Sequence, residues 1–100
     1  MTETSINYAK ALYELSVPEE AVLETEKIFR STPQLKGALE NPLVSLKEKE
    51  HVIDRVFPQE MKNFLKVTCK YQKISSIYDI LEAYGNYSRK QKGILKAVLT

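Results

Sequence analysis

Cysteine and histidine each occur only once in this sequence, which excludes most of the chemistry that depends on them. Cys69 cannot form an internal disulfide, and its apolar neighbours on a predicted helix favour a buried, inert thiol. His51 has no second histidine or cysteine nearby, whereas a zinc site needs three or four ligands. It stands one helical turn from Glu48 and Asp54, on the polar side of its predicted helix. We therefore expect a solvated histidine and no metal site.

Glycine is also scarce, and its three positions are scattered along the chain. No glycine-rich phosphate loop is present, and no serine has a histidine and an acid in a catalytic arrangement. The adjacent carboxylates Glu19 and Glu20 fall at a predicted helix start, where the helix dipole stabilises negative charge. The sequence thus predicts no catalytic residues, no cofactor and no enzyme activity.

Long apolar runs are missing as well. No stretch approaches the roughly 20 residues that a membrane-spanning helix needs. The opening segment, MTETSINYAK, has neither the basic region nor the apolar region of a signal peptide. We therefore expect no direct insertion into a membrane.

The composition that is present suits one ordinary globular domain, with 43% hydrophobic and 28% charged residues. The net charge of +2 conceals an asymmetry, because residues 1–61 carry 7 basic and 11 acidic residues while residues 62–100 carry 8 basic and 2 acidic ones. Four lysines form a basic strip on one predicted helix: Lys62, Lys66, Lys70 and Lys73. A basic half is compatible with a nucleic-acid partner, with an acidic protein partner, or with simple solvation.

Glycine, proline and capping residues divide the sequence into six predicted helices, at about residues 6–15, 17–30, 33–40, 46–57, 59–72 and 75–90. The predicted N-terminal caps are Ser5, Ser16 with Glu19, and Ser45 with Glu48. We expect Gly93 to end the last helix. The following segment, ILKAVLT, is β-prone. The predicted fold is all-α, a compact six-helix bundle over residues 1–93, with residues 94–100 beginning a linker or strand toward a second domain that is absent.

Two of these helices are more apolar than a helix with a single buried face needs to be. In the first, Tyr8, Ala11 and Leu15 widen the apolar arc to about 220°, and in the fifth the arc covers about 200°. Either both helices are central and covered on two sides, or their spare faces form an apolar groove for the amphipathic helix of a partner. Helical pattern alone leaves both interpretations open.

Three segments resemble one known family. They are YAKALYEL at residues 8–15, LENPLVSLKEKEHVIDRVF at residues 39–57, and MKNFLKVTCKYQKISSIYDILEAYGNY at residues 61–87. In this order they are similar to the delta subunit of the bacterial F-type ATP synthase, a family that includes the mitochondrial oligomycin-sensitivity-conferring protein. The likeness extends over nearly the whole chain. The family often has Gly-Arg where this chain has Gln72-Lys73.

The resemblance implies a non-catalytic subunit of the peripheral stalk, or stator, on the cytoplasmic face of the bacterial plasma membrane. The implied partners are the N-terminal helices of the alpha subunits, held in a groove between the first and fifth helices, and the b-subunit stalk through the absent C-terminal domain. Carried over by position, the groove residues are Tyr8, Ala11, Leu12, Leu15, Phe64, Val67, Thr68 and Tyr71. The alternatives are a helical adaptor of another complex and a small basic nucleic-acid-binding domain.

Overall fold

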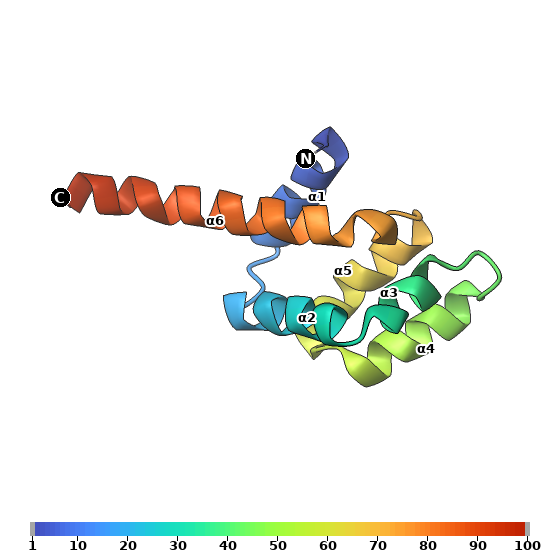
Figure 1. Ribbon diagram of the computed structural model, residues 1–100. Coiled ribbons are helices and arrows are strands. Elements are labelled where there is room, and N and C mark those ends of the chain that lie inside the picture. The colour runs from blue at the N-terminus through green and yellow to red at the C-terminus, as the bar shows by residue number, and fades with distance from the viewer. Residues whose placement is uncertain (1, 100) are drawn as a thin grey trace. The chain divides into compact units, whose positions relative to one another are not determined.

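Six α-helices and one 3-10 turn make up the part of the chain that the structure describes, which contains no strand (Figure 1). This computed structural model describes the backbone of residues 2–99 and the side chains of residues 2–91. The elements are α1 (Glu3–Glu14), α2 (Glu19–Ser31), α3 (Pro33–Glu40), α4 (Leu46–Val56), α5 (Gln59–Lys70), η1 (Ile74–Ser76) and α6 (Ile77–Leu99). The all-α prediction with six helices is confirmed. The helices fall into two compact units, α1 with α6 and α2 to α5 with η1.

In the first unit α1 packs against α6 (Figure 1). Three tyrosines mark this contact. The Tyr13 ring meets the Tyr87 ring edge-on at a centroid distance of 5.1 Å and lies 6.3 Å from the Tyr84 ring. An edge-on aromatic pair contributes about 0.5–1.5 kcal/mol beyond its buried area, so this cluster helps to fix α1 on α6.

The ends of α1 differ from their prediction. Thr2, not Ser5, caps the helix, because the Thr2 hydroxyl oxygen accepts the backbone N–H of Ser5 at 3.1 Å. At the other end Ser16 has a φ of 57° and stands just past the helix. The predicted capping box of Ser16 with Glu19 was therefore wrong: α2 begins after Pro18, which makes no side-chain capping bond. Pro18 supplies the extended backbone that a cap needs, so no serine is required.

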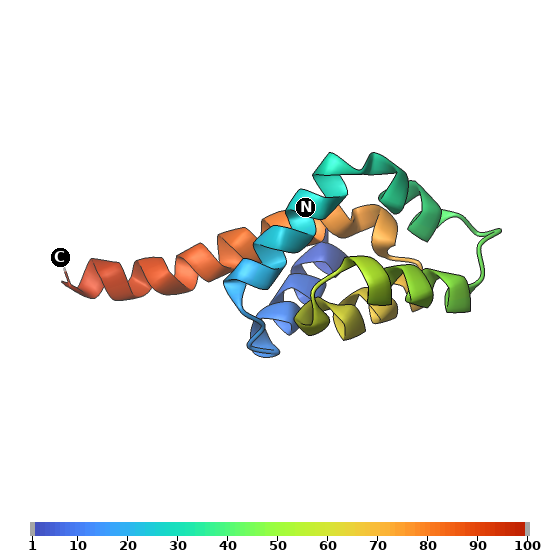
Figure 2. The same ribbon diagram turned by 90° about the horizontal axis from the view of Figure 1, so that it is seen from below.

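The second unit packs α4 along α5 and α2 against both α3 and α5 (Figure 2). The rings of Phe29 and Phe57 lie at a centroid distance of 4.9 Å. The predicted cap of α4 is confirmed, because the Ser45 hydroxyl oxygen accepts the Glu48 N–H at 3.2 Å. The fully buried large side chains of this unit are Phe29, Leu39, Ile53, Met61 and Leu65. Apolar burial of this kind supplies the main stabilisation of a small helical unit.

The end of α6 was also predicted incorrectly. The helix runs through Gly93 to Leu99, so residues 94–99 are helical and do not form an extended tail (Figure 1). A glycine inside a helix costs about 1 kcal/mol relative to alanine, but it keeps its N–H and does not break the hydrogen-bond pattern. Residue 100 lies outside the described residues. The division of the chain into a domain over residues 1–93 and a following linker stays a prediction.

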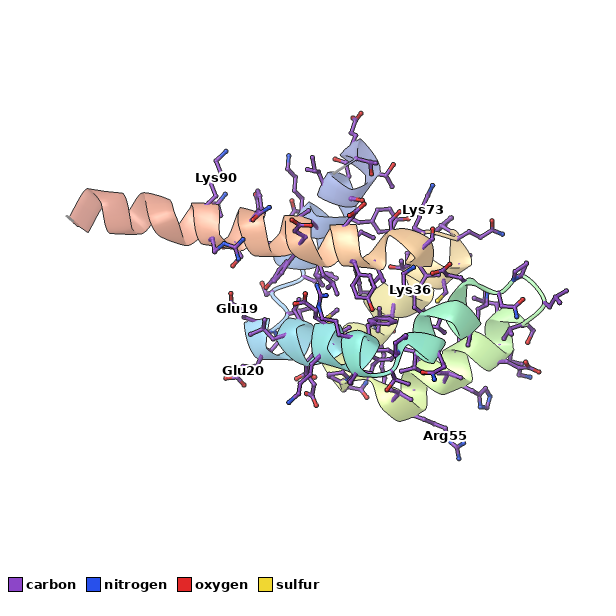
Figure 3. The ribbon with its side chains drawn as sticks, viewed as in Figure 1. Glu19, Glu20, Lys36, Arg55, Lys73 and Lys90 are labelled. Carbon is purple, nitrogen blue, oxygen red and sulfur yellow. The ribbon has the colours of Figure 1, made fainter. Side chains whose placement is uncertain are left out.

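Charged side chains project from the surface of both units. Glu19 and Glu20 extend outward from the first turn of α2, where their charge suits the positive end of the helix dipole (Figure 3). Arg55 lies in the last turn of another helix, α4, where its positive charge suits the negative end of the helix dipole. At both of these helix ends the charged side chains therefore stabilise the helix.

Candidate functional site

The predicted binding residues of α1 follow the spacing i, i+3, i+4, i+7 and form one stripe along the helix: Tyr8, Ala11, Leu12 and Leu15. The structure separates them by burial. Leu12 is 0% exposed and belongs to the core, whereas Leu15, the C-cap residue, is 59% exposed. Ala11 is exposed and Tyr8 is half-buried. Of the four predicted residues on α1, Ala11, Leu15 and part of Tyr8 are therefore accessible to a partner.

The predicted residues of α5 repeat the same spacing: Phe64, Val67, Thr68 and Tyr71. Phe64 is 7% exposed and Thr68 is 0% exposed, while Val67 and Tyr71 are 47% and 57% exposed. The Thr68 hydroxyl donates to the Phe64 carbonyl oxygen at 2.7 Å, so its polar group is satisfied inside the helix. The accessible apolar side chains on α5 are those of Val67 and Tyr71.

Within each helix the exposed apolar residues thus adjoin buried ones on a single stripe. Large apolar side chains that are about half exposed have surface left to bury against a partner. The two stripes belong to different units, and their union into one groove stays a prediction.

Metal binding finds no support among residues 2–91. No group of three or more His, Cys, Asp or Glu side chains there could hold an ion. His51 is exposed, as predicted, and the nearby Asp54 carboxylate pairs with Lys66 instead, at 2.8 Å. The hydrogen bond from Lys66 lowers the pKa of Asp54 below its ordinary value, so this carboxylate is engaged in an ion pair between helices.

The lone cysteine is buried, as predicted. Burial raises the pKa of the Cys69 thiol to about 11. A thiol with so high a pKa is almost entirely protonated near neutral pH, and the thiolate is the reactive form. Cys69 therefore has the environment of a structural residue rather than of a nucleophile.

One lysine of the predicted basic strip is neutralised by an acidic side chain. Lys66 is paired with Asp54, and the Lys70 ammonium lies 5.6 Å from the centre of the Tyr71 ring. Lys73 is exposed (Figure 3). Nucleic-acid binding relies on several cations that are free to contact phosphates. Because Lys66 is held in an ion pair, one of these cations is less available, which weakens the nucleic-acid alternative. None of the described helices is long and apolar enough to cross a bilayer.

One feature of the second unit was not predicted as a site. Lys49 is only 9% exposed and lines a pocket together with Cys69 and Ile74. The sequence signal was the position of Lys49 on the inward face of its helix, where apolar residues are expected. The carbon chain of a lysine can pack among apolar residues while its ammonium group keeps contact with solvent, and no fully buried side-chain nitrogen without a partner is found among the described residues.

Fold and surface together define an all-helical protein with exposed apolar residues on several helices, α1 and α5 among them. Comparison with known proteins is more specific. The family described as ATP synthase delta (OSCP) subunit matches residues 5–100. The chain therefore belongs to this family.

Several curated relatives are named ATP synthase subunit delta. The protein of Clostridioides difficile is 31% identical over 103 residues, covering 91% of this chain and 57% of the relative. That of Protochlamydia amoebophila is 30% identical over 106 residues, with 95% and 59% covered. That of Prochlorococcus marinus (strain MIT 9301) is 28% identical over 104 residues, with 93% and 58% covered. The chain thus spans somewhat more than half the length of these relatives. No solved structure matches it.

Proposed function

We propose that this chain is a non-catalytic part of the peripheral stalk of an F-type, proton-transporting ATP synthase, where it holds the catalytic head against rotation. The observation that carries the proposal is the family membership over residues 5–100. Rotary catalysis exerts torque on the head, and a stator resists it through tight protein contacts. This role requires a binding surface and no reactive group.

The proposed partner of this surface is the N-terminal segment of an alpha subunit, bound as an amphipathic helix. Support comes from the half-exposed apolar residues Leu15 on α1 and Val67 and Tyr71 on α5. An amphipathic helix recognises its site by placing apolar residues at i, i+3, i+4 and i+7 against such a surface. The buried members of the stripes, Leu12 and Phe64, anchor the accessible side chains to the body of each unit.

The expected affinity of one such contact is modest. Burying roughly 400 Å² of apolar surface at about 25 cal/mol per Å² yields on the order of 10 kcal/mol, and association itself costs about 4–15 kcal/mol. A single helix therefore binds weakly in isolation. Firm attachment of the head needs additional contacts.

The b-subunit stalk is the second proposed partner. We propose that it binds through a C-terminal domain, since the relatives extend well beyond the part that this chain matches. The proposed location is the cytoplasmic face of the bacterial plasma membrane.

The test is a titration of the chain with a synthetic peptide of its own synthase's alpha N-terminus, followed by backbone amide shifts. We expect saturable binding, with shifts clustered on α1 and α5. Ala11→Asp should weaken the binding about tenfold or more, because it places a charge in an apolar contact, while circular dichroism shows an intact helical fold. Gln34→Asp adds the same charge at an exposed position of α3 that belongs to neither stripe and should leave binding unchanged.

Two results would contradict this assignment. Equal binding by Ala11→Asp and the unmodified chain would remove the α1 stripe from the contact. Shifts confined to helices other than α1 and α5 would place the partner elsewhere, and a helical adaptor with a different binding surface would then be the better description.

A further inference from the structure

A pocket of about 290 Å³ lies within the second unit, where residues of α3, α4, α5 and the η1 region converge. One part of its wall is apolar and includes Leu39 and Ile74. The other part carries hydrogen-bonding side chains, Gln72 and Ser75, which are both exposed at its edge. A pocket of this size and mixed lining accommodates a small ligand with an apolar body and one polar group.

Lys49 is the uncompensated charge of this pocket. It is 9% exposed, and among the residues that the structure describes it has neither a hydrogen-bond nor an ion-pair partner. Its positive charge acts on the neighbouring Cys69 thiol and opposes the rise in the thiol's pKa that burial causes. Among the residues that the structure describes, no fully buried side-chain nitrogen lacks a partner, so the Lys49 ammonium keeps some contact with solvent. From this position it can donate hydrogen bonds to an anion that enters the pocket.

The negative charges close to the pocket do not serve as that anion. Glu40 lines the pocket, but its carboxylate is bonded to Lys36, one turn earlier on α3. Glu50 acts on Cys69 from α4 and does not line the pocket. The lining therefore carries one paired carboxylate and one unpaired ammonium, which favours an anionic occupant.

We propose that this pocket binds a small carboxylate with a short apolar body. The Lys49 ammonium donates hydrogen bonds to the carboxylate oxygens, while Leu39 and Ile74 contact the hydrocarbon part. Gln72 and Ser75 contribute polar groups at the entrance. The carboxylate belongs either to a free acid or to the C-terminus of a peptide, and the two sources share this chemistry.

Hexanoate and hexanamide are a matched pair of probes, because they share a chain length and differ in charge. Two readouts are specific to the pocket: amide shifts of residues 49, 69 and 74, and the rate of alkylation of Cys69, which is the only thiol of the chain. We expect hexanoate to shift these amides saturably and to slow alkylation. Hexanamide at the same concentration should bind at least about tenfold more weakly, because a hydrogen bond to a charged group is worth more than a neutral one.

Variants assign the effect to Lys49. Lys49→Met keeps an unbranched side chain, one atom shorter, removes the charge, and should weaken hexanoate binding about tenfold or more. Lys47→Met changes the net charge equally at an exposed position of the same helix and should have no effect. If Lys49→Met does not fold, the comparison of hexanoate with hexanamide still decides the question.

A peptide ending in leucine, tested with a free and with an amidated C-terminus, separates the two sources. Tighter binding of the free-carboxylate peptide than of hexanoate would support a peptide C-terminus, and the reverse would support a free acid. The proposal is overturned by equal binding of hexanoate and hexanamide, by unchanged binding to Lys49→Met, or by the absence of binding for every carboxylate probe.

Discussion

The Lys66 Nζ atom lies 2.8 Å from the Asp54 Oδ1 atom and joins α5 to α4. The pair sits beside His51, whose charge contributes little to the environment of Asp54 compared with the hydrogen bond from Lys66. Asp54, one helical turn from the lone histidine, thus forms an ion pair between helices, and His51 has a minor effect on it.

This ion pair predicts a pH dependence of stability. Lys66 lowers the pKa of Asp54, so the pair contributes its stability above the ordinary pKa of 3.8 and loses it as the pH falls through the lower pKa of the folded state. Asp54→Asn should therefore lower the urea midpoint slightly near neutral pH, and the difference from the unmodified chain should close in strong acid. Glu24→Gln is the control, at an exposed carboxylate of α2 that has no ion-pair partner among the described residues. A difference that persists in strong acid would show that the pair is not its cause.

Leu12 and Leu15 predict opposite responses to the same substitution. Leu12 is 0% exposed and Leu15 is 59% exposed, although they are three residues apart. Leu12→Ala should lower the free energy of unfolding by about 2–5 kcal/mol, because it leaves a cavity. Leu15→Ala should change it by no more than about 0.5 kcal/mol. Urea denaturation measures both, and similar losses for the two variants would show that Leu15 is also part of the core.

Gln72 predicts a stabilising substitution. Its φ of 57° lies in the left-handed region, which glycine adopts without strain. Gln72→Gly should therefore raise the free energy of unfolding by about 0.5–1 kcal/mol, even though glycine adds flexibility to the unfolded chain. Glu24→Gly, at an exposed position in the middle of α2, should lower it by about as much. A loss of stability for Gln72→Gly would mean that its side chain contributes more than its backbone costs.

Cys69 predicts slow thiol chemistry. Burial raises its pKa from an ordinary 9.0 to about 11, so the thiolate fraction near neutral pH falls by roughly 100-fold. Alkylation by iodoacetamide should be at least that much slower in the folded chain than in urea, and it should accelerate about tenfold for each pH unit. Mass spectrometry follows the reaction at this single thiol. Folded and unfolded chains that react at similar rates would indicate that Cys69 is accessible.

Local residue chemistry was sufficient for most helix boundaries. Pro33 starts α3, Ser45 caps α4, and Pro58 separates α4 from α5, because each of these residues acts on the backbone within one turn of itself. The same local reasoning failed at Ser16 and Gly93. Ser16 was expected to cap the next helix but adopts a left-handed conformation after α1. Gly93 was expected to end the last helix but lies inside α6.

The division of each apolar stripe required the tertiary structure. Leu12 and Leu15 have the same side chain and lie on the same apolar stripe of the helix. Packing against other elements buries Leu12 and leaves Leu15 at the surface. The burial of most of the Lys49 side chain also required the tertiary structure, since its pocket is assembled from four separate segments. Helix formation depends on neighbours along the chain, whereas burial depends on residues that are distant in sequence, and for that reason the helices were predictable and the exposed surface was not.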